Sequence, residues 1–370
     1  MLCTVSTVKD SRVNVERFIE RNLAAGADHM FVMLEQDDDG LADSLRAHPH
    51  VSPLLTDESY WHGARPIGLN RRQTVNADLV NTALSVFPSV EWLVHLDSDE
   101  CLDIDRARLS EVPADARCFQ LEPLEAVSRE HCDGEVDRFK RRLERPDLAL
   151  LTALGVIDSP ANTSYFRGHV AGKAGGRPSL DLTFQVHHVR TRRDESVEAF
   201  RAEYLRLLHY ESYSAEEFVR KWEALLSSGK AGLRESRSLL RSAVLAVQRN
   251  PNLGPDARGG YLRRLYKLHV EDQVDVLEEL GFLVTPDPEC HNHRPEGFSP
   301  EDGALIASLL TRLSLADKAG LQHGAPDAPA KLLEQVRRGL DRQDRALAER
   351  IDTCLDRGPR RGGPISLIRR

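Results

Sequence analysis

The most informative segment of the chain is Glu91-Trp92-Leu93-Val94-His95-Leu96-Asp97-Ser98-Asp99-Glu100. Its first part is a nearly continuous apolar run, which is typical of a short strand covered on both faces in a parallel sheet. The run ends abruptly in acidic residues. Side chains alternate along an extended chain, so if the strand geometry persists Asp97 and Asp99 point to one side and Ser98 to the other. We therefore predict a buried strand that presents two carboxylates at its carboxyl end.

Two converging carboxylates suit a hard divalent cation. Mg²⁺ and Mn²⁺ are usually held by one or two carboxylates together with phosphate oxygens of a substrate. Open α/β sheets also bind ligands beyond the carboxyl ends of their strands. We therefore predict a Mn²⁺ or Mg²⁺ site at Asp97 and Asp99. The alternative is a solvated acidic loop that continues through Asp103 and Asp105, because such short motifs also arise by chance.

Strands and helices alternate over the first hundred residues. This order implies βαβ units, right-handed crossovers and a mainly parallel sheet. The glycine-rich dinucleotide fingerprint is absent after the first strand, where Val8-Lys9-Asp10-Ser11 stands, and this argues against a nicotinamide enzyme. The expected strands are residues 2–8, 30–34 and 51–55, and the expected helices carry Val15 to Leu23, residues 41–47 and residues 70–87, with a long loop at 56–69.

Three segments carry a resemblance to a known family: residues 5–10, Ala25-Gly26-Ala27-Asp28-His29, and residues 94–102 with their Asp-x-Asp-Glu. They resemble glycosyltransferases of the GT-A fold, in particular bacterial family 2 and family 92-like enzymes, over roughly residues 2–222. The resemblance implies a Rossmann-like domain with a mainly parallel mixed sheet. It also implies transfer of a sugar, with inversion, from a nucleotide diphosphate sugar to a hydroxyl of a carbohydrate or small-molecule glycoside. We expect a UDP-sugar.

The chain departs from that family at two places. Many members have Asn-Glu where this chain has Lys9-Asp10, and an aromatic residue where it has Cys101. These departures favour an alternative, a catalytically degenerate protein that binds a sugar nucleotide without turning it over. A second alternative is a metal-dependent phosphohydrolase, which uses water as acceptor and typically a paired-metal site.

Several side chains are candidates for binding the donor. Asp10 follows the first strand, Arg72 and Asn76 lie on the helix before the acidic strand, and Asp97 would act through the cation. Glycines let a backbone approach an anion closely, and the segment 168–178 combines glycines with two cations. It resembles the Gly-Lys loop of the same glycosyltransferases. We expect its Lys173 and Arg177 to contact the diphosphate, unless the segment is an ordinary glycine-rich hairpin.

In the resembling families a histidine late in the domain can complete the metal site. His209 is the first candidate and His187 the second. An imidazole ligand favours Mn²⁺ over Mg²⁺. Both residues also have an ordinary interpretation as structural histidines.

An inverting transfer needs a general base within hydrogen-bond reach of the acceptor hydroxyl. Three carboxylates are alternatives for this role: Glu122, Glu125 and Asp158. Residues 129–145, which lie between them, are heavily charged with little apolar content. We expect this segment to be an exposed helix or lid.

We predict four regions along the chain. Residues 1–212 form the GT-A catalytic domain, 213–329 an α-helical region packed on it, 330–356 an amphipathic carboxyl-terminal helix, and 357–370 a disordered basic tail. The apolar stripe of the 330–356 helix suggests docking, with a homodimer as the expected arrangement.

Composition narrows the class of protein. A formal net charge of -8 argues against a nucleic-acid binder that works through a general basic surface. The six cysteines lack CxxC spacing, and no apolar run approaches the length of a membrane span. We expect a cytoplasmic protein with no integral membrane segment.

Overall fold

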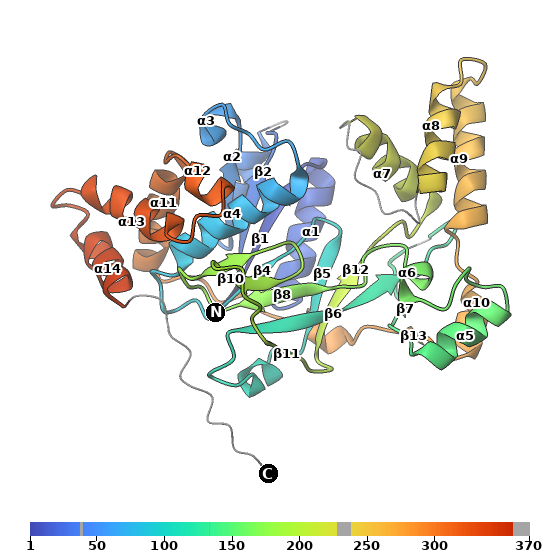
Figure 1. The fold of residues 1–370 in the computed structure, drawn as a ribbon, viewed down its shortest axis with the longest axis horizontal. Helices are drawn as coiled ribbons and strands as arrows, with labels where there is room; N and C mark the ends of the chain where they lie inside the picture. Colours follow the sequence, from blue (N-terminus) through green and yellow to red (C-terminus); the bar gives the residue numbers. More distant parts are fainter. Residues whose placement is uncertain (38–39, 133, 228–237, 358–370) are drawn as a thin grey trace, which may run out of the picture. The chain divides into compact units, whose positions relative to one another are not determined.

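The computed structural model describes residues 1–37, 40–132, 134–227 and 238–357 (Figure 1). The chain forms two compact units. The first contains Met1–Leu121, Lys173–Leu205 and the chain from Pro288, and the second contains Glu122–Gly172 and Arg206–Asp287. Each unit is thus assembled from segments that are far apart in the sequence.

The sheet of the first unit is built on four parallel strands: β1 (Leu2–Val8), β2 (His29–Leu34), β3 (Val51–Leu55) and β4 (Trp92–His95). β1 lies between β4 and β2, and β3 pairs with β2. β8 (Lys173–Gly176) is antiparallel both to β4 and to the start of β6 (Cys118–Ala126), to which β11 (Ala199–Phe200) adds in parallel. The predicted mainly parallel, mixed α/β sheet is confirmed.

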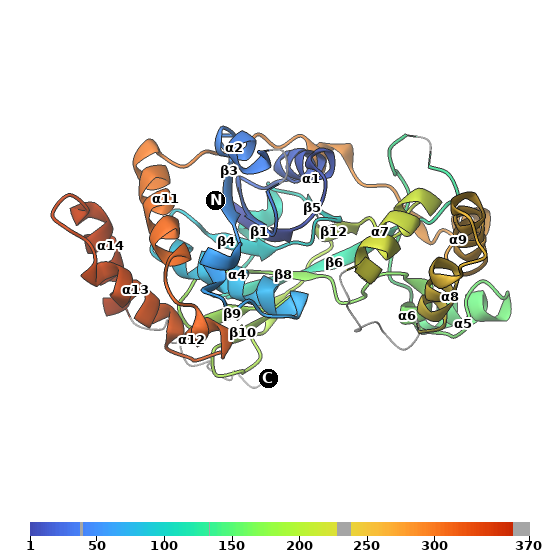
Figure 2. The ribbon, with the colours of Figure 1, turned by 90° about the horizontal axis from the view of Figure 1, so that it is seen from above.

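Helices cover both faces of this sheet (Figure 2). α4 (Leu69–Leu84) packs on β1 and buries Val75, Leu79 and Val80 completely, whereas α1 (Arg12–Ala24) lies on the other face and contacts β2. The short helices α2 (Leu41–Arg46) and α3 (Glu58–Trp61) stand in the connections, α3 inside the predicted long loop. A small hairpin of β9 (Leu182–Phe184) and β10 (Val189–Thr191) completes this part.

The acidic segment does not continue as a solvated loop. After a turn at 97–99 the chain forms β5 (Glu100–Ile104), and all five of its residues are buried. Asp103, which the loop alternative placed in solvent, is 1% exposed. Leu102 and Ile104 alternate with Cys101 and Asp103 along this strand, and the apolar members explain its burial.

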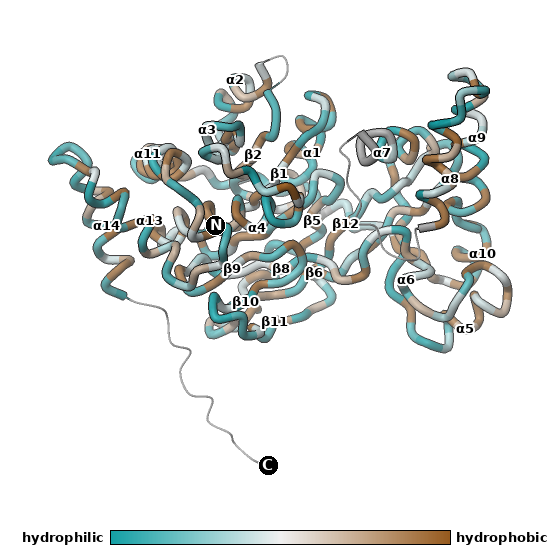
Figure 3. Tube along the Cα trace, turned by 45° about the horizontal axis from the view of Figure 1, so that its top comes forward, coloured by the Kyte–Doolittle hydropathy of each residue, from teal (hydrophilic) through white to brown (hydrophobic). Residues whose placement is uncertain are grey.

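The predicted α-helical carboxyl-terminal region is confirmed. α11 (Pro300–Ser314), α12 (Ala319–Gln322) and α13 (Ala328–Arg338) pack on α4, and α14 (Arg345–Asp356) packs on α13. Two helices therefore occupy the segment predicted to be one, because the first ends at Gly339 and residues 339–344 turn. Brown and teal positions alternate along both helices in Figure 3, as an amphipathic pattern requires.

The apolar stripe of α13 and α14 is used within the chain. Leu332, Leu333, Val336, Leu347 and Ile351 are buried in the same core cluster as α4. The stripe therefore no longer supports a homodimer, which stays a prediction. Residues 358–370 of the predicted basic tail lie outside the described residues.

The second unit is organised on the later part of β6. That part pairs in parallel with β12 (Leu205–His209) and antiparallel with β7 (Phe139–Lys140), and β13 (Leu283–Val284) pairs with β7. The remaining helices are α5 (Arg145–Ala153), α6 (Asn162–Tyr165), α7 (Ala215–Ser227), α8 (Ser238–Arg249), α9 (Pro255–His269) and α10 (Val274–Glu279). The predicted limits at residues 212 and 329 stay predictions.

The segment 129–145 is not the expected exposed helix or lid. It contains strand β7, and Phe139 and Lys140 are both 0% exposed. The charge of Lys140 is buried because carboxylates surround it. In the described part of the chain no helix has the length and apolarity needed to cross a membrane. No disulfide links any of the six cysteines, all of which lie in that part.

Candidate functional site

The carboxyl ends of the parallel strands bring several polar side chains to one edge of the first unit's sheet. Asp10 follows β1, Glu35 follows β2 and Asp97 follows β4. The first turn of α4 adds Arg72 and Gln73, which are both buried. Because parallel strands end on the same side, residues far apart in the sequence meet at this edge.

Asp97 is the centre of this group. Its Oδ1 accepts a hydrogen bond of 2.5 Å from Gln73 Nε2, and its Oδ2 accepts one of 2.6 Å from Lys173 Nζ. Its backbone N–H donates to Glu100 Oε2 at 2.7 Å. The side chain of Asp97 is still 26% exposed, whereas those of Lys173 and Glu100 are completely buried. The acidic turn, residues 97–100, is thus held in one conformation.

Electrostatics keep this site charged. Burial disfavours the charged carboxylate of Asp97, but the charge and hydrogen bond of Lys173 together with the nearby His95 hold the pKa of Asp97 well below its usual range. Burial likewise opposes the charge of Lys173, while Asp97 and Glu100 together raise its pKa above the ordinary value. Burial, followed by the charge of Lys173, lowers the pKa of His95 to about 4. At neutral pH the site therefore contains an ionised Asp97, an ammonium and a neutral imidazole.

Strand register separates the two cations predicted to bind phosphate. β8 runs antiparallel to β4, with Leu93 opposite Gly176 and Val94 opposite Gly175. This register brings Lys173 to the carboxyl end of β4, beside Asp97. It carries Arg177 to the other end, where the guanidinium pairs with Glu91 at 2.8 Å and stacks on Trp92 at 4.0 Å. The two positions differ by four residues, or roughly 13 Å along a strand, so Arg177 is not part of this edge.

The other predicted donor-binding residues have structural partners. Arg72 is buried against Glu35 and donates to the backbone oxygens of Pro66 and Ile67 at 2.9 and 2.8 Å, which fixes the loop before α4. Asn76 is 0% exposed and donates to Thr7 Oγ1 at 2.9 Å.

Asp10 Oδ1 accepts from Ser11 N and Asn14 Nδ2 at 2.7 and 2.8 Å, and so stabilises the start of α1. Asp10 is partly accessible at this edge of the sheet, whereas the side chains of Arg72 and Asn76 are buried. A role for Asp10, Arg72 or Asn76 in binding the donor stays a prediction.

His187 lies between β9 and β10, half-buried, with its ring 6.3 Å from that of His188. Its charge contributes to the low pKa of His95, so it lies near this site. Asp99 is half-buried in the acidic turn. Carboxylate oxygens are the donors that Mg²⁺ and Mn²⁺ prefer, and Asp97 and Asp99 are both partly accessible, so their chemistry fits a divalent cation.

In the second unit, Glu125 is at the centre of a buried ionic network. Its Oε1 lies 3.0 Å from Lys140 Nζ and accepts from Arg167 N at 2.5 Å, and its Oε2 accepts from Gly168 N. Lys140 also pairs with Asp272 at 2.9 Å. Glu125 is 0% exposed. In this geometry Glu125 holds the 167–168 backbone, and its role as a general base stays a prediction.

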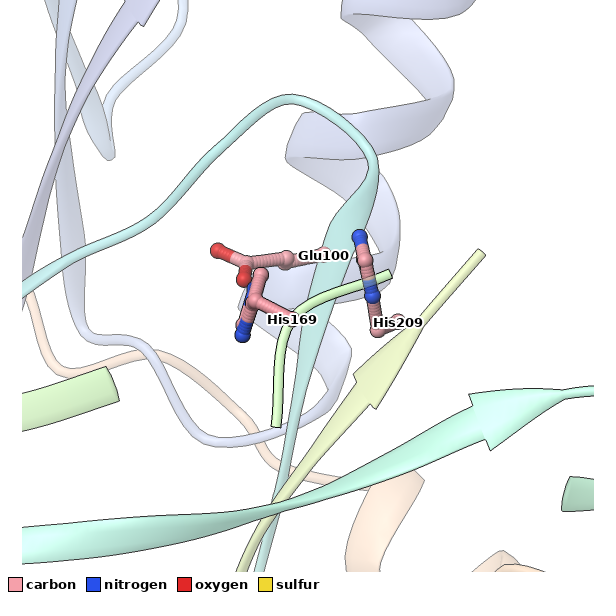
Figure 4. Close-up of side chains that lie close together, drawn as sticks. All are labelled: Glu100, His169 and His209. Atoms are coloured by element: carbon pink, nitrogen blue, oxygen red, sulfur yellow. The ribbon is translucent and has the colours of Figure 1, made fainter. Parts of the chain in front are cut away.

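His209 ends β12 in this unit. Figure 4 shows its ring beside that of His169, and the centroids are 4.6 Å apart in a stacked arrangement. A Cβ added at Gly168 would lie 2.1 Å from His209 Cε1, so only glycine allows this packing. His209 Nε2 is 3.9 Å from Glu211 Oε2, and its Nδ1 is 3.9 Å from Glu125 Oε2. Whether His209 or His187 binds a metal stays a prediction.

Two of the three general-base candidates are accessible. Glu122 lies on β6 with its side chain 40% exposed and its Oε1 3.3 Å from Arg142 Nε. Asp158 is exposed in the segment after α5. Exposure leaves both able to meet a substrate, in contrast to Glu125.

The sequence alone did not single out Glu35, Gln73 or His169 as residues of the site. It predicted a role for Lys173, but not the side chains that Lys173 contacts. Gln73 could have been suspected, because it lies in the first turn of the helix that leads to the acidic strand. Nothing local marks His169, whose neighbours come from distant strands.

Comparisons with known proteins leave the family open. No protein-family model matches the chain, and no curated protein does. Among solved structures, the mannosyltransferase PcManGT from Pyrobaculum calidifontis, in complex with GDP-Man and Mn²⁺, is 12% identical with a TM-score of 0.30 and covers 96% of this chain and 84% of its own.

Two other solved structures are also similar. TarS from S. aureus is 12% identical with a TM-score of 0.25, covering 92% of both chains. HddC from Yersinia pseudotuberculosis is 12% identical with a TM-score of 0.25, covering 49% of this chain and 78% of its own. Likenesses of this size do not assign a family or a substrate.

Proposed function

We propose that this chain is a metal-dependent glycosyltransferase that moves a sugar from a nucleotide diphosphate sugar, with a UDP-sugar as the expected donor, to an acceptor hydroxyl with inversion. One observation carries the proposal. An ionised, partly exposed Asp97 lies at the carboxyl end of a parallel strand in the middle of the first unit's sheet, where α/β sheets bind their ligands. The resemblance of the surrounding motif to the GT-A Asp-x-Asp-Glu segment supports it.

In this proposal the first unit provides charge. Asp97 and Asp99 would hold Mn²⁺ or Mg²⁺, which when bound neutralises negative charge on a leaving diphosphate. Gln73 orients the Asp97 carboxylate, and Glu100 fixes the backbone of the turn.

A carboxylate of the chain would provide the base. Glu122 and Asp158 are the accessible candidates, and Glu122 is the better placed because a strand fixes its backbone. Replacing Glu122 by Gln should reduce turnover while leaving donor binding unchanged. Unchanged turnover would indicate that Asp158, not Glu122, is the general base.

The test is thermal stabilisation by a panel of nucleoside diphosphates with Mn²⁺, Mg²⁺ or EDTA. A ligand at about 100 times its dissociation constant stabilises the folded state by about 2.7 kcal/mol. We expect one nucleotide to raise the melting temperature, and EDTA, Asp97→Asn and Asp99→Asn each to abolish the rise. Ser98→Ala is the matched control, because it changes a neighbouring residue of the same turn without removing a carboxylate, and it should behave as wild type.

Each negative result has a distinct meaning. Absence of a shift with every nucleotide contradicts the donor site. A shift without any sugar transfer favours the degenerate binder, and release of phosphate with water as the only acceptor favours the phosphohydrolase.

A further inference from the structure

We propose that Lys173 is the resident counter-ion of the acidic turn, and that it makes divalent-cation binding at Asp97 depend on a diphosphate. The inference rests on the proposed function and concerns the control of that same site. It departs from the sequence-based expectation, in which Lys173 reaches out to phosphate.

The placement of Lys173 carries the argument. It begins β8, a strand paired on both sides, with Leu121 of β6 opposite it, and its own carbonyl accepts from Gln120 Nε2 at 2.8 Å. The side chain is 0% exposed. Neither its backbone nor its stem can therefore swing outward to a ligand without breaking the sheet.

The ammonium is already occupied by the acidic turn. Nζ lies 2.6 Å from Asp97 Oδ2, 3.4 Å from Glu100 Oε2 and 3.5 Å from His95 Nδ1. One ammonium thus lies between two buried or partly buried carboxylates, those of Asp97 and Glu100. The ammonium thus cancels one of the two charges that a metal ion would use.

A metal ion would compete with this ammonium. Asp97 Oδ1 already accepts from Gln73 and Oδ2 from Lys173, so both oxygens are engaged. A divalent cation at either oxygen would lie close to the Lys173 charge, and like charges a few ångströms apart in a partly buried site repel strongly. The protein alone should therefore bind the cation weakly.

A diphosphate removes this obstacle. Its negative charges would offset the repulsion between the cation and Lys173. Cation and diphosphate then raise each other's affinity, and by linkage the factor is the same in both directions. Lys173 would act as a positioning residue and a charge gate, not as a phosphate ligand.

The experiment is equilibrium dialysis of Mn²⁺ against the full chain, with no nucleotide, for wild type and Lys173→Met. The control is Lys318→Met, because Lys318 is a buried lysine of the same unit whose Nζ donates to the backbone oxygens of Tyr60, Ser314 and Ala316. We expect Lys173→Met to bind Mn²⁺ at least about tenfold more tightly than wild type, and Lys318→Met to match wild type. Equal or weaker binding by Lys173→Met overturns the proposal.

Two further measurements guard against a variant that does not fold. Lys173→Met combined with Glu100→Gln restores the net charge of the buried group, so it should lose most of the gain of Lys173→Met. An undiminished gain in the double variant contradicts the charge argument. In wild type, saturating UDP should tighten Mn²⁺ binding at least about tenfold. Equal affinity with and without UDP overturns the proposed coupling between cation and diphosphate binding. If wild type retains no Mn²⁺ even with UDP, the proposed function fails, whereas the Mn²⁺-only comparison still decides the role of Lys173.

Discussion

Replacing Glu125 by Gln separates a structural carboxylate from a catalytic one. Glu125 accepts two backbone N–H groups, one at each oxygen, and neutralises Lys140 at 3.0 Å. A glutamine has one acceptor oxygen and one NH₂ donor. Whichever way the amide turns, one backbone N–H of residues 167–168 faces a donor, and the Lys140 ammonium loses one of its two carboxylates.

The size of the effect follows from burial. Removing one partner of a buried ion pair costs about 3–5 kcal/mol, against a total stability of about 5–15 kcal/mol for a typical domain. The matched control is Glu122→Gln on the same strand. Its ion pair with Arg142 has side chains 40% and 46% exposed, and breaking such a surface pair costs at most about 1 kcal/mol.

Urea unfolding followed by circular dichroism gives both free energies, and hydrogen exchange at residues 167–168 reports the local effect. We expect Glu125→Gln to lose several kcal/mol and to exchange faster at those amides, and Glu122→Gln to do neither. If Glu125→Gln is as stable as Glu122→Gln but inactive, Glu125 is a catalytic base and the structural interpretation is wrong.

Three other predictions concern a close packing contact, a surface ion pair and a buried histidine. Gly168→Ala would place a Cβ 2.1 Å from His209 and should lower the free energy of unfolding by about 1–3 kcal/mol in a melting experiment. The control Gly259→Ala, in α9 with open space around it, should raise it by about 0.5–1 kcal/mol. Equal effects of the two substitutions would refute the contact. Arg177→Ala removes the pair with Glu91 and should leave nucleotide affinity within about twofold of wild type in a calorimetric titration, so a tenfold loss would return Arg177 to the site. Burial, then His50 and His48, lowers the pKa of His29 to about 3. The unfolded chain binds a proton at this residue near pH 6.5 and the folded chain does not, so the free energy of unfolding should fall by about 1.4 kcal/mol per pH unit between pH 6 and 4. Unfolding curves of His29→Gln should lack this component of the slope.

The local sequence pattern was enough to predict the strands of the parallel core. Burial of alternate or consecutive side chains dictates periodicity, and this is visible in a window of a few residues. Leu2–Val8 and Val51–Leu55 were predicted with the bounds that the structure has, and the acidic strand ends where its apolar run ends. The position of Asp97 at the edge of the sheet follows from the same pattern, because parallel strands share their carboxyl edge.

Partners across long separations could not be predicted in this way. Lys173 reaches Asp97, 76 residues away, only because β8 is antiparallel to β4 in one register. The same register, shifted by four positions, sends Arg177 to the opposite end of the strand.

In the sequence Glu125 resembles any surface acid, whereas in the structure Lys140 and the 167–168 backbone surround it. A charge has the same local signature whether solvated or buried, and its fate depends on which distant groups compensate it. Composition and periodicity therefore located the acidic edge, whereas register and burial decided which charged residues act at it.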